Sequence, residues 1–418
     1  MIRFMSLKLA LAVLAAAACG PGVQAQLVPP VGDILDTVDR LGNDALRDVR
    51  RTADETGRAA RRLVRQRLSR LRRHVRRSGG ALEMSADGPA VRGEILALDA
   101  GEEGLVRARE AGFRLLSEER IEGLDIAYVR LGIPEGLSVD EAGALLEMLG
   151  LGGEAAPDHI YFTSGTASLA IAAQSALAGG TVSRPAIGIV DGGVARHPSL
   201  SGGVEQRGFA RGAPIASEHG TAVASLAAGR GAIDGGAPGV ALLVADIYGN
   251  DPAGGSASAV ARAIGWMAQR RVPVVTLSIA GPANPLVGEA VRRARARGIL
   301  FVAAVGNDGP AAPSSYPASF PGVIAVTGVD RRNRVLPEAG RAAHLDYAAP
   351  GADMRAASAR GGARRVRGTS FAAPLVAGRL AALGSRARLD AEAQDLGERG
   401  PDDVYGRGLI CGNCRNSD

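Results

Sequence analysis

Cysteine, aromatic residues and long apolar runs are scarce in this chain of 418 residues, which has three cysteines and 3% aromatic residues. So few cysteines exclude a fold stapled by many disulfides, and the apolar run at residues 9–18 is too short to span a membrane. Glycine is abundant instead, with 58 residues, and Ala, Val and Leu carry most of the apolar content. This composition favours an α/β protein with close helix–sheet packing, and the length suggests two or three domains.

Residues 1–25 have the pattern of an export signal. Arg3 and Lys8 flank the start of the apolar run, and a small-x-small cleavage site ends at Ala25. We therefore expect an exported protein, either periplasmic or secreted. Cys19 follows three alanines and weakly resembles a lipoprotein acylation site. Because the usual leucine three residues upstream is absent, lipid anchoring at Cys19 is the less favoured alternative.

Two cysteines remain after signal removal, Cys411 and Cys414, in a C-terminal tail of residues 391–418. In an oxidising compartment they either close a small disulfide loop or stay as free thiols. A zinc site would need two more ligands, and no partner pair is visible, so we assign no metal to them.

A basic helical arm is predicted over residues 26–80, and its second half is dense in arginine. Apolar residues recur there at helical spacing: Leu63, Val64, Leu68, Leu71 and Val75. Such a helix either lies on an anionic surface such as a membrane or nucleic acid, or packs one stripe on a neighbouring domain, which we favour. The pI near 9.7 is high mainly because the basic residues are concentrated in this arm. We expect no nucleic-acid partner.

Residues 81–164 show the pattern of a small domain. Strands are predicted over residues 91–98, 113–120, 125–131 and 159–163, with helices over 102–111 and up to about 149. Ser138 and Glu141 form a capping box ahead of the second helix. The order β-α-β-β-α-β is the split βαβ pattern, which predicts a small α+β, ferredoxin-like domain.

Residues 165–390 change to a repeat of buried strands and helices. Short Val- and Ile-rich runs are typical of strands buried on both faces of a parallel sheet: residues 186–190, 240–247, 273–279, 299–305 and 323–329. Helices are predicted between them, over residues 257–270 and 285–297. In such sheets functional groups gather at the carboxyl ends of the strands.

Four polar residues stand at strand ends or helix starts in this region. Asp191 and Asn307 each follow a predicted strand, and His219 and Ser370 each open a helix rich in small residues. Each has an ordinary explanation, because Asp and Asn favour turns, Ser caps helices, and a lone His is often structural. A carboxylate, an imidazole, a hydroxyl and an amide donor are, however, the groups that nucleophilic acyl transfer requires.

The segments around three of these residues resemble the motifs of the subtilisin-like serine proteases. AIGIVDGGV, EHGTAVASLAAG and RGTSFAAPLVAG are similar to that family's Asp, His and Ser blocks, in the family's chain order. The resemblance covers roughly residues 165–385 and implies a three-layer fold with a mostly parallel sheet. It also implies that Asp191, His219 and Ser370 form a catalytic triad, with Asn307 and the backbone N–H of Ser370 as oxyanion donors.

Two further segments resemble parts of the same family. VVTLSIAG is similar to the substrate-aligning strand, which implies that Ser278, Ile279 and Ala280 bind a polypeptide substrate near an apolar pocket. The small domain lies where the family has its propeptide, a chaperone and intramolecular inhibitor whose tail occupies the cleft. The resemblance implies a first self-cleavage within residues 162–167.

The sequence departs from the family pattern in several places. Gly192 stands where Ser or Thr is common, and Thr276 stands where Asn is frequent. The chain after Gly229 lacks the longer Asn-rich loop that binds calcium in many relatives, so we assign no metal and no cofactor. The basic arm has no counterpart in the family pattern.

The expected function is therefore that of a secreted or envelope serine endopeptidase, made as a self-processing zymogen. Two alternatives remain: a catalytically inactive relative that serves as a binding protein, and an acyl-transfer ligase on the same fold. The first conflicts with a site in which all four roles are filled. The second requires that water be kept from the acyl-enzyme, and nothing in the sequence indicates this.

Overall fold

The computed structural model describes residue 58 and residues 61–151, 155–164 and 186–415. The predicted export signal and Cys19 lie outside the described residues. Residues 60–418 group into one compact unit, to which the elements below belong. Within the described part of the chain, no helix has both the length and the apolar character that crossing a membrane requires.

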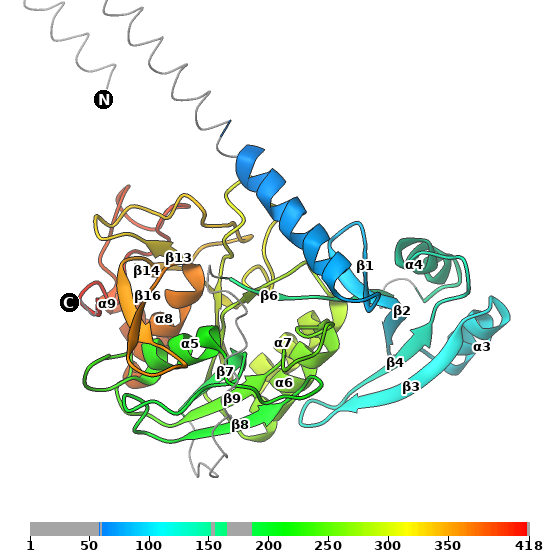
Figure 1. Cartoon of the computed structure of the whole chain (residues 1–418), viewed down its shortest axis with the longest axis horizontal. Coiled ribbons are helices and arrows are strands. Elements are labelled where there is room, and N and C mark those ends of the chain that lie inside the picture. Colours follow the sequence, from blue (N-terminus) through cyan, green and yellow to red (C-terminus); the bar gives the residue numbers. More distant parts are fainter. Residues whose placement is uncertain (1–57, 59–60, 152–154, 165–185, 416–418) are drawn as a thin grey trace, which may run out of the picture. The chain divides into compact units, whose positions relative to one another are not determined.

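The large domain, residues 186–415, contains a seven-stranded sheet whose neighbouring strands all run parallel (Figure 1). The strands follow the order β14 (Tyr347–Pro350), β13 (Ile324–Val329), β12 (Leu300–Ala304), β10 (Val274–Leu277), β7 (Ile187–Asp191), β9 (Leu242–Asp246) and β8 (Val204–Gly208). The five predicted strands are confirmed, and β8 and β14 at the two edges are additional. The predicted strand 273–279 is divided in the structure: β10 belongs to the sheet, whereas β11 (Ile279–Ala280), which follows it, lies outside the sheet.

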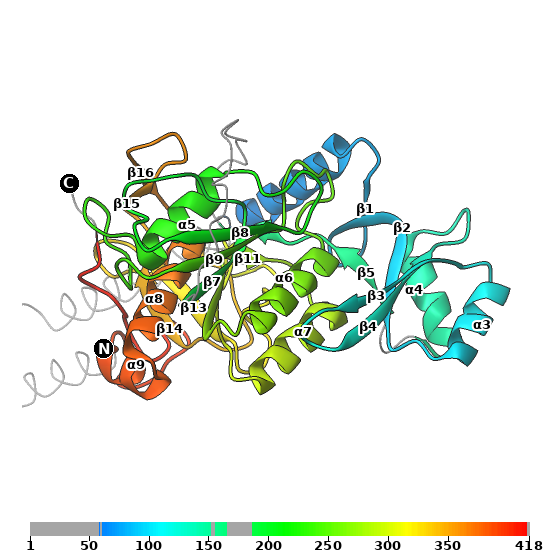
Figure 2. The same ribbon diagram turned by 90° about the horizontal axis from the view of Figure 1, so that it is seen from below.

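Helices cover both faces of this sheet, so the predicted three-layer α/β fold is confirmed. α5 (Glu218–Ala228) and α8 (Ala373–Leu383) share one core with one face of the sheet. α6 (Ala257–Gln269) and α7 (Pro285–Ala296) pack on the other face (Figure 2). The hairpin of β15 (Met354–Ala357) and β16 (Ala363–Val366) and the short helix α9 (Arg386–Glu392) complete the domain.

The small domain, residues 81–164, has the predicted split βαβ arrangement. Four antiparallel strands follow the order β5 (Ala155–His159), β2 (Pro89–Leu98), β4 (Ile126–Gly132) and β3 (Arg114–Ile121), and β1 (Leu82–Met84) also pairs with β2. One face of this sheet packs on α3 (Glu102–Glu110) and α4 (Val139–Met148). The predicted capping box of Ser138 and Glu141 begins α4.

One predicted strand of the small domain is wrong. Residues 159–163 do not form one strand, because β5 ends at His159 and a separate strand, β6 (Phe162–Thr163), pairs with β11 of the large domain. The tail of the small domain thus enters the large domain as an added strand.

The basic arm is helical where the structure describes it. Residues 61–77 form one helix, which we call the basic helix. Of its predicted apolar stripe, Leu71 is buried, Leu63, Val64 and Val75 are half-buried, and Leu68 is exposed. The helix therefore packs part of its stripe against the rest of the chain, as the favoured interpretation predicts.

The second face of the small domain's sheet packs on α6 and α7, in the same core cluster as those helices. At the end of this sheet, the buried carboxylate of Asp158 accepts hydrogen bonds from the backbone N and Oγ of Ser258, at 2.9 and 2.6 Å. Arg130 donates to the same carboxylate at 3.0 Å. Because Ser258 lies in the first turn of α6, Asp158 caps that helix from the small domain and also meets its positive end.

Close packing at α6 depends on two glycines. A Cβ at Gly265 would lie 2.6 Å from the carbonyl oxygen of Glu122 and also overlap Ile121. A Cβ at Gly123, whose φ is +78°, would lie 2.6 Å from the carbonyl oxygen of Gly265. The turn between β3 and β4 therefore rests on the helix through backbone atoms, which only glycine permits at these positions.

We expect Gly265→Ala to destabilise the full chain by about 1–3 kcal/mol, because the new methyl overlaps backbone that cannot move aside cheaply. The control is Gly143→Ala in α4, where a Cβ would make only an ordinary contact of 3.8 Å with Ile95. That change should stabilise by up to about 1 kcal/mol, because Ala favours a helix over Gly. Equilibrium urea unfolding of the full chain measures both values. Equal effects of the two substitutions would contradict the close contact at α6.

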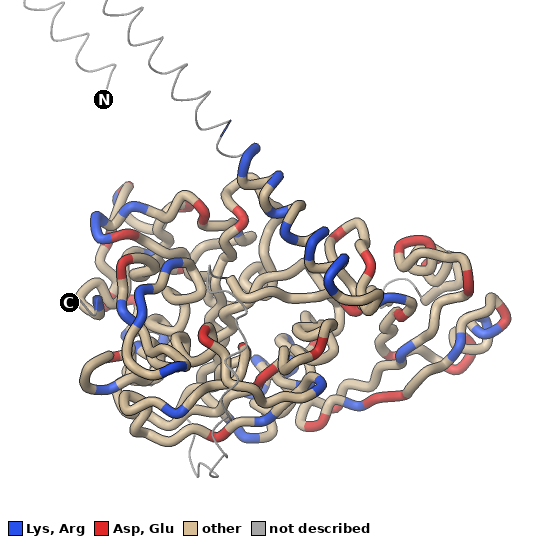
Figure 3. Tube along the Cα trace, in the orientation of Figure 1, with Lys and Arg blue, Asp and Glu red and all other residues tan. Residues whose placement is uncertain are grey.

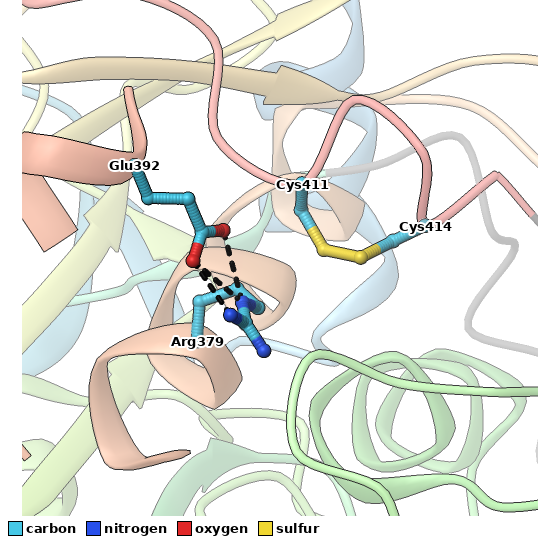
Figure 4. Close-up of a disulfide and its surroundings, with 4 residues drawn as sticks. All are labelled: Arg379, Glu392, Cys411 and Cys414. Atoms are coloured by element: carbon cyan, nitrogen blue, oxygen red, sulfur yellow. Dashed lines mark hydrogen bonds and ion pairs between the residues drawn. A yellow bond between two sulfur atoms is a disulfide. The ribbon is translucent and has the colours of Figure 1, made fainter. Parts of the chain in front are cut away.

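The C-terminal cysteines are joined in a disulfide, Cys411–Cys414, which is one of the two alternatives that the sequence leaves open. Cys411 is buried in the core cluster that contains α8 and Leu389 of α9. Beside it, Arg379 of α8 donates three hydrogen bonds to the carboxylate of Glu392 of α9, at 2.9, 3.1 and 2.6 Å (Figure 4). The disulfide closes a local loop of the last segment, and the ion pair joins α9 to α8.

Reduction should lower the free energy of unfolding of the large domain by about 2 kcal/mol, the chain-entropy value for so short a loop. The measurement is denaturant unfolding with and without a reductant. The Cys411→Ala/Cys414→Ala variant serves as the control, since its stability should not respond to the reductant. A wild-type protein that is equally stable under both conditions would contradict a stabilising role for this bond.

Candidate active site

Three of the predicted site residues meet in one hydrogen-bonded line. Asp191 is the last residue of β7, His219 lies in the first turn of α5, and Ser370 lies in the short 3-10 turn Thr369–Phe371 before α8. His219 Nδ1 is 2.8 Å from Asp191 Oδ2, and His219 Nε2 is 2.9 Å from Ser370 Oγ. Because a carboxylate only accepts, Nδ1 carries the proton and Nε2 is left to accept the hydroxyl hydrogen of Ser370.

Backbone contacts bring β7 and α5 this close together. Ser217 caps α5 by accepting from the backbone N of Gly220 at 2.9 Å. A Cβ on Gly220 would overlap the carbonyl oxygen of Gly192, and a Cβ on Gly192 would lie 2.9 Å from Cβ of Ser217. The glycine at position 192, where relatives commonly have Ser or Thr, is therefore explained by Ser217, which occupies the space beside it.

Asn307 lies on the other side of Ser370, after β12, and its amide is held in one orientation. Its Oδ1 accepts from the backbone N of Thr369 at 3.0 Å. The Oγ1 of Thr369 donates to the carbonyl of Gly306 at 3.0 Å. Nδ2 of Asn307 is thereby directed into the site as a donor. Sequence reasoning missed Thr369 as the residue that positions Asn307, although it stands directly before Ser370.

Two donors converge on one carbonyl oxygen at this point, that of Ser164 at the end of the small domain. The Nδ2 of Asn307 donates to it, and the backbone N of Ser370 donates at 3.2 Å. The carbonyl of Ser164 therefore lies beside the backbone of Ser370 and within reach of both donors. A tetrahedral oxyanion formed from this carbonyl would be stabilised by the same two groups.

The residues before Ser164 bind as a strand between two segments of the large domain. Phe162 and Thr163 pair with Ala280 and Ile279, and Ser164 N donates to the carbonyl of Ser278 at 3.0 Å. On the other side, Tyr161 N donates to the carbonyl of Gly255 at 2.7 Å. The predicted substrate-binding residues thus act through their main chain.

The side chain of Ser278 has a different role from the one expected, because its Oγ donates to the carbonyl of Ser370 at 2.9 Å and supports that residue from behind. Sequence reasoning also missed the residues that enclose Tyr161. The Tyr161 side chain is fully buried against Gly281, and its hydroxyl donates to the carbonyl of Pro282 at 2.9 Å. The hydroxyl of Tyr248 donates to the Tyr161 carbonyl at 3.1 Å.

A buried carboxylate outside the triad organises the loops around the site. Asp246 ends β9 directly opposite Asp191 in the sheet register. It accepts from the backbone N of Ile215, Tyr248 and Gly249, at 2.7, 2.9 and 3.0 Å. Burial raises the pKa of Asp246, and the nearby charge of Asp191 raises it further. Because its oxygens are fully engaged with backbone donors, Asp246 fixes the loops rather than taking part in the chemistry.

A cavity of about 240 Å³ lies between the bound tail and these loops. Its wall includes Thr163, Ser217, His219 and Tyr248, together with His74 of the basic helix. Thr276, the second departure from the family pattern, is buried outside this cavity, and its hydroxyl has no hydrogen-bond partner among the described residues. The described residues also contain no group of three or more His, Cys, Asp or Glu placed to hold a metal ion.

Known proteins match the large domain closely. The model of the subtilase family matches residues 183–396. Subtilisin DY of Bacillus licheniformis is 32% identical over 247 residues, which are 54% of this chain and 88% of that protein. The minor extracellular protease Epr of Bacillus subtilis (strain 168) is 28% identical over 240 residues, which are 54% of this chain but only 37% of Epr.

A solved structure extends the likeness beyond the large domain. The crystal structure of fervidolysin from Fervidobacterium pennivorans, described as a keratinolytic enzyme related to subtilisin, aligns with a TM-score of 0.61 and 22% identity. The alignment covers 80% of this chain and 62% of fervidolysin, and at this identity it shows the fold alone. The family match, the subtilisin relatives and the three-layer fold show that this chain belongs to the subtilase family of subtilisin-like serine proteases.

Proposed function

We propose that the protein is an exported serine endopeptidase, made as a zymogen that cuts itself between Ser164 and Gly165. The observation that carries this proposal is the carbonyl of Ser164, which accepts from Asn307 and Ser370 N beside the Ser370 hydroxyl. The tail of the small domain is bound as a substrate would be bound, with its last carbonyl in the oxyanion site. The intact chain thus supplies its own first substrate.

The chemistry begins at the hydroxyl of Ser370. His219 Nε2 takes the proton as Ser370 Oγ attacks the carbonyl carbon of Ser164, and Asp191 stabilises the imidazolium that forms. Asn307 Nδ2 and Ser370 N hold the oxyanion. His219 then gives its proton to the nitrogen of Gly165, which leaves as the new N-terminus. Water, activated by the same imidazole, hydrolyses the acyl-enzyme and restores the hydroxyl.

The small domain then acts as an inhibitor. Three contacts favour a complex that persists after the cut. They are the pairing of β6 with β11, the hydrogen bond of Asp158 at the start of α6, and the packing of the small domain's sheet on α6 and α7. The triad residues are at most 2% exposed while the tail is in place. Peptidase activity on other polypeptides therefore requires that the small domain be removed. Export through residues 1–25, and periplasmic or secreted location, belong to the same proposal.

After the small domain has been digested with an added protease that is then removed, Ser370→Ala and His219→Ala should each have a kcat/KM at least about 10⁴-fold below that of the wild type treated in the same way, because hydroxyl and base act as a unit. Asn307→Ala should lower it about 10²–10³-fold, because one oxyanion donor is lost. Peptide hydrolysis at neutral pH measures these values, with the exposed Ser201→Ala as an unaffected control. Near-normal turnover by His219→Ala would show that the base is wrongly assigned.

The same preparations separate the two alternatives. A fluorophosphonate should label the matured wild type at Ser370, whereas a catalytically inactive binding protein would stay unlabelled. If the enzyme is a ligase, products joined to an added amine should exceed hydrolysis products, and we expect hydrolysis to dominate.

Self-cleavage should produce a new N-terminus at Gly165, within the window of residues 162–167 that the family resemblance implies. Mass spectrometry of the purified wild-type chain identifies that terminus. The Ser370→Ala chain should remain a single polypeptide beyond signal removal. Cleavage at this bond in purified Ser370→Ala would show that another protease does the work.

A further inference from the structure

The basic helix lies against the loop that carries an oxyanion donor. Arg67 Nε is 3.0 Å from Oδ2 of Asp308, and Arg70 pairs with Oδ1 of the same carboxylate. Asp308 directly follows Asn307. Next to it, Leu63 covers Gly309, where a Cβ would lie 2.7 Å from Cδ1 of Leu63. The helix therefore contacts the Asn307 loop through both charge and apolar surface.

The other end of the same helix contacts the bound tail. The ring of His74 meets Phe162 of β6 edge to face, with ring centroids 5.0 Å apart and planes at 84°. Burial lowers the pKa of His74, which favours the neutral ring in this contact. Leu71, one turn before it, is 4% exposed.

These contacts lie on one side of the helix. The residues that make them are three or four positions apart, a spacing that places side chains on one face of a helix: residues 63, 67, 70 or 71, and 74. Other arginines, such as Arg65 and Arg72, are exposed. Figure 3 shows how basic residues follow the helix along its length. The helix thus bridges Phe162 and the Asn307 loop with one face and leaves charge on the other.

We propose that Asp308, Gly309 and the bound Phe162 form a docking site for the basic helix, and that the helix is a second inhibitory segment that keeps the cleaved tail in the cleft. This inference rests on the proposed function. β6 pairs with β11 over two residues, and hydrogen bonds at Tyr161 and Ser164 extend this pairing. The basic helix adds a contact to the side chain of Phe162 between them. The helix adds its contacts through a short covalent link, because Ser78 ends it and Leu82 begins β1. Linked contacts of this kind raise affinity by effective concentration.

The test compares two double variants of the full chain. Arg67→Ala/Arg70→Ala removes both ion pairs to Asp308, and Arg65→Ala/Arg72→Ala removes the same charge from the exposed side. Alanine keeps the helix in both. After self-cleavage, size-exclusion of the diluted complex and the appearance of peptidase activity measure how tightly the fragment of residues up to 164 is held.

We expect Arg67→Ala/Arg70→Ala to be cut normally but to bind the cleaved fragment about tenfold more weakly, since two partly exposed ion pairs are lost. The control variant, Arg65→Ala/Arg72→Ala, should bind its cleaved fragment as tightly as the wild type does. Added salt should weaken the complexes of the wild type and of the control variant more than the complex of Arg67→Ala/Arg70→Ala, which has already lost the ion pairs. Equal retention in all three chains would overturn the proposal. So would equal weakening by both double variants, because the effect would then follow net charge and not the Asp308 contact.

A second measurement does not depend on cleavage. In the Ser370→Ala chain, amide hydrogen exchange at residues 306–310 and 61–77 should rise with Arg67→Ala/Arg70→Ala and not with Arg65→Ala/Arg72→Ala. If exchange separates the variants while no chain with Ser370 cuts itself, docking stands and the proposed function fails. If the chain cuts itself while neither exchange nor retention separates the variants, the function stands and the docking site is refuted.

Discussion

The end of β7 and the first turn of α5 touch through backbone atoms, and the hydrogen bonds of the triad depend on that contact. Asp191 and His219 meet at 2.8 Å only because Gly192 and Gly220 carry no side chains between them. Ser217 links the two segments, since it caps α5 and also donates to the carbonyl of Gly193 at 3.2 Å. A parallel sheet brings Asp191 to its carboxyl edge, and the glycines decide how near the helix comes.

The same edge of the sheet explains why the tail of the small domain meets both Asn307 and the backbone N of Ser370. β10 leads directly into β11, which pairs with the tail, and β12 leads directly to Asn307. Thr369 then ties the Asn307 amide to the turn that carries Ser370. Ser278 supports the carbonyl of Ser370 from the opposite side. Hydroxyl, donors and strand are thereby fixed to rigid elements, so little rearrangement is needed to place a carbonyl among them.

The sequence predicts the central strands and the residues that meet at the site because both signals are local. Buried strands such as β7 are short apolar runs, and Asp191, His219 and Ser370 stand in compact motifs. The edge strand β8 carries no such signal, because its sequence VEQRG is polar and half-exposed, and β14, although buried, is only four residues long. Partners far apart in the chain leave no local signal. The division of residues 159–163 between two sheets, and the contact of Arg67 with Asp308 across 241 residues, depend on the folded arrangement alone.

The contact between Gly123 and Gly265 gives the small domain a means of being recognised by shape. At this point neither Gly123 nor Gly265 has a side chain, so the backbone of the turn lies directly against α6. The fit depends on the absence of a side chain: a small domain with any side chain at the tip of the equivalent turn would be held away from α6. A subtilase with a larger residue at the equivalent of Gly265 would likewise reject this small domain. The two glycines therefore match this turn to this helix by shape alone.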